Sequence, residues 1–245
     1  MSASWPPVTR LAINVMLRRI KIASSMVRND GLRRAMTYAL NRFAEARYER
    51  GFEVQTRGQI RLETLGICNP DSAEYAPTSY GGFFKAMRHV PDKTGAFVDY
   101  GSGLGRILVA ATTFPFSRII GIELSAALIE RCRVNLGGRD VQLVCQDAAQ
   151  YRVPRDVTVF HFFNPFGGAT LRAVVTDMAR SLHEAPRQAW VVFANPWFIE
   201  PLMRAGEIIP HAWQKSTADE MWPFHRPDPK HQNSDRYRIY MLDSR

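Results

Sequence analysis

The stretch that most constrains the fold is residues 96–125, AFVDYGSGLGRILVAATTFPFSRIIGIELS. A short apolar run is followed directly by three alternating glycines in residues 101–105. Helical apolar spacing then covers residues 106–113, and a second apolar run, residues 118–124, carries Glu123 near its end. A chain that leaves a strand and enters a helix within about five residues needs backbone conformations that glycine permits. The stretch therefore predicts a β-α-β nucleotide-binding unit.

The ligand of this unit can be narrowed from its chemistry. A helix N-terminus offers free N–H groups and a positive dipole end to an anionic group. Glu123 follows Gly103 at about the offset, roughly 20 residues, where an acidic side chain reaches ribose hydroxyls. The dinucleotide fingerprint is G-x-G-x-x-G, whereas the third glycine here is Gly105 and Arg106 follows it. The pattern predicts a ligand with a ribose and a negative group, and its glycine spacing disfavours a nicotinamide dinucleotide.

The spacing D-x-G-x-G-x-G, with Asp99 two residues before the first glycine, resembles motif I of class I S-adenosylmethionine (SAM)-dependent methyltransferases. This resemblance implies SAM as cofactor, S-adenosylhomocysteine as product, and a doubly wound Rossmann-like sheet. Asp99 would help to hold the amino-acid end, Glu123 the ribose, and Asp147 the adenine. The full set of implied cofactor residues is Tyr75, Thr78, Asp99, Gly101, Ser102, Gly103, Gly105, Glu123, Asp147 and Asn164.

Three of these residues have a structural alternative. Tyr75 and Thr78 precede the first strand, in a segment that often folds over the cofactor in this family, and they could touch SAM or form a wall of the acceptor pocket. The alternative is a helix entry in which Thr78 or Ser79 is the N-cap. Asp147 follows an alternating strand and could be a turn or cap residue.

The tripeptide Asn164-Pro165-Phe166 follows a near-continuous apolar run, residues 156–163, which is typical of a central parallel strand. Ligands of open α/β sheets bind beyond the carboxyl ends of the strands, so the tripeptide faces the reaction. We expect His161, inside the run, to be a satisfied core histidine. A second such tripeptide, residues 195–197, ends the next strand.

Asn164-Pro165-Phe166 resembles motif IV of amine-directed methyltransferases, N/D-P-P-Y/F, without its second proline. The Asn164 side-chain oxygen and the rigidly held Pro165 carbonyl can each accept an N–H bond, which leaves the amine lone pair aimed at the methyl group. Phe166 can stack on a base or enclose an alkylammonium chain. These three residues are the predicted catalytic set.

The missing proline disfavours a base-methylating enzyme, so we expect a protein amine, lysine first, as acceptor. The alternatives are a nucleic-acid base or small amine, a SAM-binding module without turnover, and a nicotinamide oxidoreductase. Together the motifs resemble a family of little-characterised bacterial class I methyltransferases over roughly residues 50–245. They are more distantly similar to the lysine N-methyltransferases of the ATP synthase c subunit, which share the Y-x-P segment and the D-x-G-S-G-x-G-R turn.

The apolar pattern predicts an α/β fold with seven strands and a late hairpin. This count resembles the sheet of the class I methyltransferases, which implies that the last strand enters antiparallel. The expected strands are residues 96–100, 118–124, 141–146, 156–163, 188–194, 208–214 and 237–242. The expected helices are residues 32–49, 82–89, 106–113, 126–136, 170–184 and 198–205. Residues 216–235 are proline-rich and predict a loop over the site.

The net charge of +9 is concentrated at the N-terminus. Residues 1–60 hold 11 Lys and Arg against 4 Asp and Glu, whereas residues 61–245 hold 21 against 19. We expect a basic helical extension, residues 1–50, and a methyltransferase domain, residues 51–245. The amphipathic helix in residues 1–30 could pack on the domain, bind an anionic membrane or an acidic partner, or be a mitochondrial presequence. The nearly balanced remainder disfavours a nucleic-acid groove.

The expected location is the cytoplasm, with peripheral membrane binding as an alternative, or the mitochondrion if the source is eukaryotic. Cys68, Cys132 and Cys145 are far apart and form no C-x-x-C, so we expect buried cysteines in a reducing compartment and no metal site. No uncharged apolar run reaches 18 residues, so no membrane-spanning helix is predicted.

Overall fold

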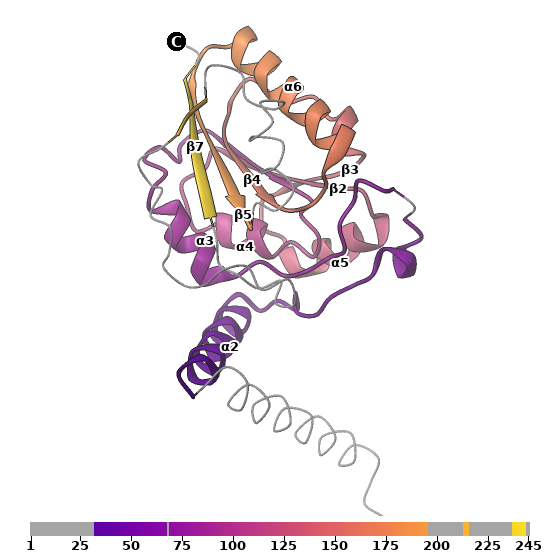
Figure 1. Cartoon of the computed structure of the whole chain (residues 1–245), viewed down its shortest axis with the longest axis vertical. Helices are drawn as coiled ribbons and strands as arrows, with labels where there is room; N and C mark the ends of the chain where they lie inside the picture. The colour runs from indigo at the N-terminus through magenta and orange to yellow at the C-terminus, as the bar shows by residue number, and fades with distance from the viewer. Residues whose placement is uncertain (1–31, 68, 196–212, 216–236, 244–245) are drawn as a thin grey trace, which may run out of the picture. The chain divides into compact units, whose positions relative to one another are not determined.

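The computed structural model describes residues 32–67, 69–195, 213–215 and 237–243 of the 245-residue chain (Figure 1). The predicted basic helix, the helix at residues 198–205 and the loop at residues 216–235 lie outside the described residues. The chain divides into two compact units, Met1–Tyr48 and Glu49–Arg245. The described part of the first unit belongs to α2, Leu32–Phe52, whose last residues belong to the second unit.

The second unit is built on one mixed sheet with the strand order β3-β2-β1-β4-β5-β7-β6. Its strands are β1 Ala96–Tyr100, β2 Arg118–Glu123, β3 Gln142–Cys145, β4 Val157–Phe163, β5 Gln188–Ala194, β6 Trp213–Lys215 and β7 Tyr237–Asp243. β1 to β5 pair in parallel, whereas β7 is antiparallel to both β5 and β6. The predicted doubly wound α/β sheet is confirmed, and so is its antiparallel last strand.

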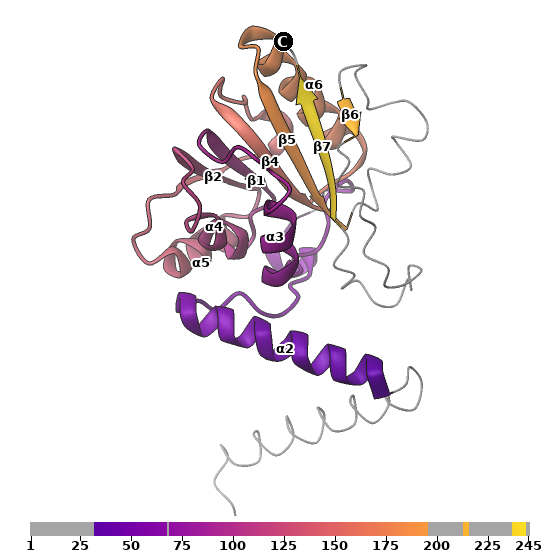
Figure 2. The ribbon, with the colours of Figure 1, turned by 90° about the vertical axis from the view of Figure 1, so that its left-hand side faces the viewer.

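Helices cover both faces of this sheet (Figure 1, Figure 2). One face carries α3 Tyr80–Met87, α4 Arg106–Ala111 and α5 Ala126–Leu136, and the other carries α6 Gly168–Glu184. Two short 3₁₀ helices, η1 Leu62–Leu65 and η2 Ala148–Gln150, lie in the loops. Because both faces are covered, the central strands are buried on both sides, as their continuous apolar runs predict.

Local capping explains where the helices begin and end. The Ser125 side chain accepts a hydrogen bond from the N–H of Leu128, and Gly137 ends α5 in the left-handed conformation. Ser79, rather than Thr78, caps α3 by accepting from the N–H of Gly82. Ser125 is therefore the N-cap of α5, and of the two predicted N-cap candidates for α3, Thr78 and Ser79, the structure shows Ser79.

Alternating side chains of the strands divide the core between the two faces. On the α6 face, the Tyr100, Phe162 and Phe193 rings form a stack across β1, β4 and β5, with centroids 4.7 Å and 4.6 Å apart. On the opposite face, His161 packs edge-on against Phe83 of α3. Full burial of one such aromatic ring stabilises the fold by about 1.5–3 kcal/mol. The stack keeps the carboxyl ends of three strands in a fixed arrangement beneath the loops that follow them.

Some expectations need correction. Cys132 is buried as expected, but Cys145 is exposed at the end of an edge strand, and Cys68 lies outside the described residues. The helix after β4 begins at Gly168, two residues earlier than predicted. None of the described helices is both long and apolar enough to cross a lipid bilayer.

Candidate functional site

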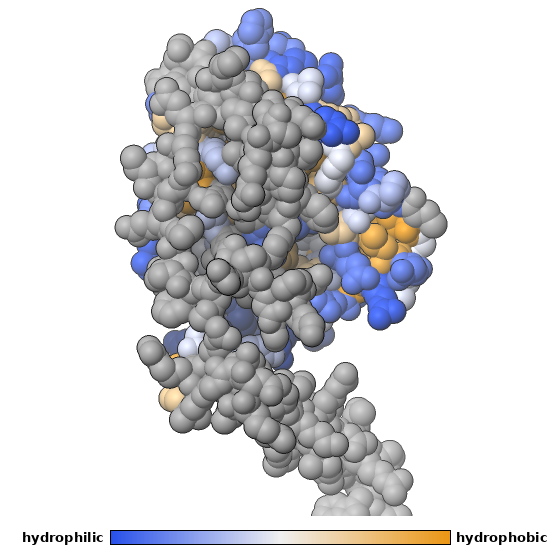
Figure 3. All heavy atoms as spheres, in the orientation of Figure 1, coloured by the Kyte–Doolittle hydropathy of each residue, from blue (hydrophilic) through white to orange (hydrophobic). Residues whose placement is uncertain are grey.

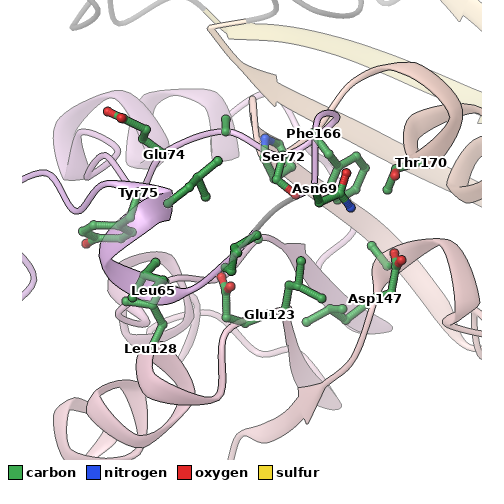
Figure 4. A pocket seen from close by; sticks show the side chains of 18 of the residues that line it. Leu65, Asn69, Ser72, Glu74, Tyr75, Glu123, Leu128, Asp147, Phe166 and Thr170 are labelled. Atoms are coloured by element: carbon green, nitrogen blue, oxygen red, sulfur yellow. The ribbon is translucent and has the colours of Figure 1, made fainter.

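A pocket opens at the carboxyl ends of β1 to β4, where the strand order changes direction (Figure 4). Open α/β sheets bind ligands at this point. Its lining comes from the strand ends and from a segment that precedes β1. The lining residues are Leu62, Leu65, Ile67, Asn69, Ser72, Ala73, Glu74, Tyr75, Gly101, Ile122, Glu123, Leu124, Leu128, Gln146, Asp147, Ala148, Phe163, Pro165, Phe166 and Thr170.

The glycine turn has the backbone that its sequence predicts. Gly101, Gly103 and Gly105 have φ of +72°, +54° and +82°, in the left-handed region that favours glycine. A Cβ at Gly101 would lie 2.3 Å from the Pro165 side chain, and one at Gly103 would lie 2.4 Å from the Tyr75 ring. The turn therefore needs glycine both for its conformation and for the close approach of two other predicted site residues.

Glu123 ends β2 and lines the pocket directly beside the turn. Its carboxylate accepts hydrogen bonds from the N–H groups of Gly103 and Ser125, both at 2.9 Å. Only 8% of the residue is exposed, and this burial raises the pKa of the carboxyl above its ordinary value, against the lowering effect of the two backbone bonds. The carboxylate thus fixes the glycine turn and also borders the pocket.

Asp147 lines the pocket after β3 and also caps η2. Its Oδ1 accepts from the N–H of Ala149 at 2.9 Å. The two interpretations of this residue are therefore compatible, because one carboxylate oxygen caps the turn while the residue borders the pocket.

The tripeptide after β4 has a special backbone. Asn164 has φ of +42°, an uncommon value for a residue with a side chain, and Asn195 at the end of neighbouring β5 has +53°. Phe163 and Ala194 are partners in the sheet, so the two asparagines follow paired positions. Pro165 and Phe166 line the pocket, whereas Asn164 borders it in sequence without being part of its lining.

One predicted role at this tripeptide needs revision. The Pro165 carbonyl accepts a hydrogen bond from the N–H of Ala73 at 3.0 Å, so one of its lone pairs is already used. Phe166 is 7% exposed and packs edge-on against Tyr100 and Phe162, so its ring is both part of the core and a wall of the pocket.

Residues 69–75, which we call the cover segment, cross the pocket and were not predicted as a unit. Ser72 forms an isolated antiparallel β-bridge with Phe166. The Asp71 carboxylate accepts a hydrogen bond from the N–H of Thr170, in the first turn of α6, at 3.0 Å. This cap from a distant segment explains why α6 begins earlier than its own sequence indicates. The Asn69-Pro70-Asp71 turn was visible in the sequence, but nothing local pointed to its partner 99 residues away.

Asp99 lies elsewhere than expected. It is 3% exposed, bonds His161 Nδ1 at 2.7 Å, and is not among the residues that line the pocket. The reason is the two-residue period of β1, which places Asp99 on the opposite face from Tyr100. His161 Nε2 is buried and has no hydrogen-bond partner among the described residues, so this histidine is only half satisfied.

Two further predicted cofactor residues are buried away from the lining. Thr78 is 6% exposed, and its carbonyl accepts from Arg106. Ser102 is 5% exposed, and its hydroxyl has no partner among the described residues. Of the predicted set, the structure brings together Tyr75, Gly101, Glu123, Asp147, Pro165 and Phe166 around one pocket.

The pocket carries negative charge although the chain is strongly basic. The charged members of its lining are Glu74, Glu123 and Asp147, and no Lys, Arg or His is among the described residues that line it. Apolar side chains of η1, α5 and the β2 end form another wall, and hydrophobic atoms reach the surface near η1 and α5 in Figure 3. The described residues contain no group of three or more side chains suited to a metal ion.

Comparisons with known proteins add the following. No protein-family model matches the sequence, and no curated protein does. Among solved structures, the chain is similar to the ribosomal protein L11 methylase of Lactobacillus delbrueckii subsp. bulgaricus, with 14% identity and a TM-score of 0.42 over 66% of this chain and 74% of that one. It is also similar to precorrin 8w decarboxylase of Methanobacterium thermoautotrophicum, with 21% identity and a TM-score of 0.44 over 58% and 75%.

A third similar structure, the YcgJ protein of Bacillus subtilis, shares 16% identity and a TM-score of 0.38 over 47% of this chain and 51% of that one, about half its length. Likenesses at this level assign no activity. The antiparallel β7 agrees with the late antiparallel strand that the motif resemblance implies. The chain has a doubly wound, Rossmann-like α/β fold. In this fold the glycine turn, Glu123 and Asp147 occupy successive strand ends.

Proposed function

We propose that this chain transfers a methyl group from SAM to a nitrogen acceptor. The observation that carries the proposal is the pocket at the switch point of the sheet. There the glycine turn meets two carboxylates, Glu123 and Asp147, and no basic side chain lines the described pocket. SAM carries a positive sulfonium and an ammonium group, so the sign of the pocket suits it.

The residues at the strand ends fit successive parts of SAM, with Glu123 of β2 suited to the ribose and Asp147 after β3 suited to the adenine. Glu123 can accept from ribose hydroxyls, because a carboxylate offers about four lone-pair sites and two are used by backbone N–H groups. Asp147 keeps a second oxygen for the adenine amino group, since its Oδ1 caps η2. When bound, SAM supplies an electrophilic methyl group on sulfur.

The same charges disfavour two of the alternatives. A dinucleotide needs its pyrophosphate at the turn, but the Gly103 N–H already donates to Glu123, and the neighbouring carboxylates repel phosphate. A nucleic-acid acceptor gains its affinity from Lys and Arg contacts to phosphates, and the described pocket lining supplies none.

The acceptor side follows from the tripeptide after β4. We propose that the Asn164 amide oxygen accepts an N–H of the acceptor amine, with the second lone pair of the Pro165 carbonyl available for another. The amine nitrogen then forms its bond to the methyl carbon as the carbon–sulfur bond breaks, and the nitrogen releases a proton to solvent. Orientation of this kind lowers barriers by about 7–11 kcal/mol. A protein lysine, once deprotonated, is the acceptor we favour.

Incubation with methyl-labelled SAM and a cell lysate tests the acceptor class. Label in protein supports the proposal, whereas label in RNA or in a small molecule supports the corresponding alternative. No transfer, together with tight S-adenosylhomocysteine binding, identifies a SAM-binding module without turnover.

Substitution of Asn164 tests its role. Although the resemblance includes Asn164 among the cofactor residues, it is outside the pocket lining, so Asn164→Ala is expected to change S-adenosylhomocysteine affinity little. The variant is expected to lower methyl transfer about 100-fold, because the acceptor loses its orientation. Asn164→Asp keeps an accepting oxygen and is expected to retain most of the activity. Wild-type turnover in the alanine variant would remove Asn164 from the mechanism.

A further inference from the structure

A buried polar cluster joins the glycine turn to the end of α2. Arg106 follows Gly105 as the first residue of α4 and is 5% exposed. Its Nε donates to the Thr56 hydroxyl at 2.8 Å and its Nη1 to the Thr78 carbonyl at 3.0 Å. Its Nη2 donates to the Glu49 carboxylate at 2.8 Å. The guanidinium group of Arg106 therefore connects α4 to two distant segments, residues 49–56 and the segment at Thr78.

Glu49 completes the cluster. It is 7% exposed, and its Oε1 also accepts from the N–H and the hydroxyl of Thr56, at 3.0 Å and 2.5 Å. Its Oε2 pairs with Arg57 at 2.9 Å. A buried ion pair tolerates little change, because removal of one partner leaves an uncompensated buried charge. The position of Thr56 is thus fixed by Glu49 and Arg106 together.

Thr56 in turn connects the cluster to the pocket. It is fully buried, and its carbonyl accepts a hydrogen bond from the Tyr75 hydroxyl at 2.6 Å. The Tyr75 ring lies against Gly103, whose hypothetical Cβ would come within 2.4 Å of it. Burial raises the pKa of the Tyr75 hydroxyl, so the group remains a donor at neutral pH. A continuous set of contacts therefore runs from the ion pair through Thr56 and Tyr75 to the turn.

We propose that Glu49 and Arg106 are positioning residues that hold Tyr75 against the glycine turn and so set the affinity of the pocket for the adenosyl cofactor. The proposal rests on the proposed function. Neither residue lines the pocket, so both act through Tyr75. The cofactor-binding unit then includes the last turn of α2, which the sequence had assigned to the extension.

A double-mutant cycle separates positioning from general stability. Glu49→Gln and Tyr75→Phe are each expected to weaken S-adenosylhomocysteine binding about five- to tenfold in calorimetry, the effect of one lost buried hydrogen bond. The double variant is expected to bind about as well as the weaker single variant, because both changes act through the same contact. Glu49→Gln should lower the melting temperature by a similar amount in the wild type and in Tyr75→Phe. Additive losses of affinity, or none, would overturn the proposal.

A matched control comes from the other side of the sheet. Asp177 of α6 is also a buried carboxylate that accepts from two arginines, Arg152 and Arg180, and from the Val153 N–H. Asp177→Asn is expected to lower the melting temperature and leave S-adenosylhomocysteine affinity unchanged. An equal loss of affinity in this variant would mean that any loosening of the fold weakens the site, which contradicts a specific role for Glu49.

A second readout needs no ligand. Amide hydrogen exchange in peptides that cover residues 99–108 is expected to be faster in Glu49→Gln than in the wild type, and unchanged in Asp177→Asn. If the wild type fails to bind S-adenosylhomocysteine, the proposed function is wrong, while exchange still decides the positioning role. Unchanged exchange in Glu49→Gln contradicts it. If Glu49→Gln does not fold, Arg106→Lys takes its place in the double-mutant cycle. This variant keeps the positive charge but cannot make all three hydrogen bonds of the Arg106 guanidinium group.

Discussion

Glu123 contributes to the fold and also lines the pocket. Its carboxylate fixes the glycine turn through Gly103 and borders the pocket at the same time. Burial raises the pKa of this carboxyl in the folded protein. Because the folded protein holds the proton more tightly than the unfolded chain does, the stability contributed by this group is present below about pH 4.3 and is lost as the pH rises through the raised pKa. The ionised carboxylate is therefore kept at a cost in stability.

We predict that ligand affinity depends on pH in the opposite direction to the stability contributed by Glu123. S-adenosylhomocysteine affinity should fall on acidification, beginning at a higher pH than for an ordinary glutamate, because the protonated carboxyl accepts ribose hydroxyls less well. Calorimetry between pH 5 and 8 should show this loss in the wild type and much less of it in Glu123→Gln, whose affinity should be about tenfold weaker at neutral pH. Identical pH profiles for the two proteins would remove Glu123 from the ribose site.

At the scale of single residues, sequence reasoning succeeded where the constraint was local. The glycine turn and the place of Glu123 beside it each depend on neighbours within one β-α-β unit. For Asp99, motif spacing did not indicate the partner on β4, His161, that its carboxylate contacts. The Pro165 carbonyl was assigned to the acceptor without the Ala73 N–H that also binds it.

At the scale of elements, the cover segment is the part that the sequence did not reveal. Residues 69–75 have no apolar period of their own, and their position depends on Asp71 at the N-terminus of α6 and on the Ala73–Pro165 bond. β1 to β5 and β7 were predicted within one residue of their bounds, because burial of these strands leaves a strong apolar signal. β6 was predicted at residues 208–214 but is described only at Trp213–Lys215. A loop held by polar contacts to distant segments leaves none.

Removal of the Asp71 side chain tests this arrangement. Asp71→Ala is expected to destabilise the protein by about 1–2 kcal/mol in urea unfolding, because α6 loses its cap and the charge near its N-terminus. Asp140→Ala, at an exposed aspartate after α5, is the control and should change stability by less than about 0.5 kcal/mol. Equal stability of the two variants would show that the cap contributes nothing.

At the scale of the whole molecule, the charged residues are unevenly distributed. The excess of basic residues lies in residues 1–60, whereas the pocket lining is acidic. In the first unit, α2 exposes Met36, Leu40 and Phe43, one turn apart along the helix, by 56%, 66% and 71%. A basic segment followed in the sequence by exposed apolar side chains is typical of binding to an anionic surface. We therefore keep membrane attachment of the N-terminal unit as a prediction.

Sedimentation with vesicles tests this prediction. The full chain is expected to bind vesicles that contain about 30% phosphatidylserine and to bind less at higher salt, because the attraction is screened. A variant that lacks residues 1–30 should sediment less. Equal sedimentation of the two chains, or none by the full chain, would contradict the prediction.

We propose that the pocket at the end of β1 and β2 holds SAM, with the positive charge of the cofactor next to the glycine turn. Titration of the wild-type chain by calorimetry with S-adenosylhomocysteine, SAM and NAD is the direct test. We expect micromolar or tighter binding of SAM and S-adenosylhomocysteine, and no binding of NAD. Binding of NAD without binding of SAM or S-adenosylhomocysteine would contradict the proposal.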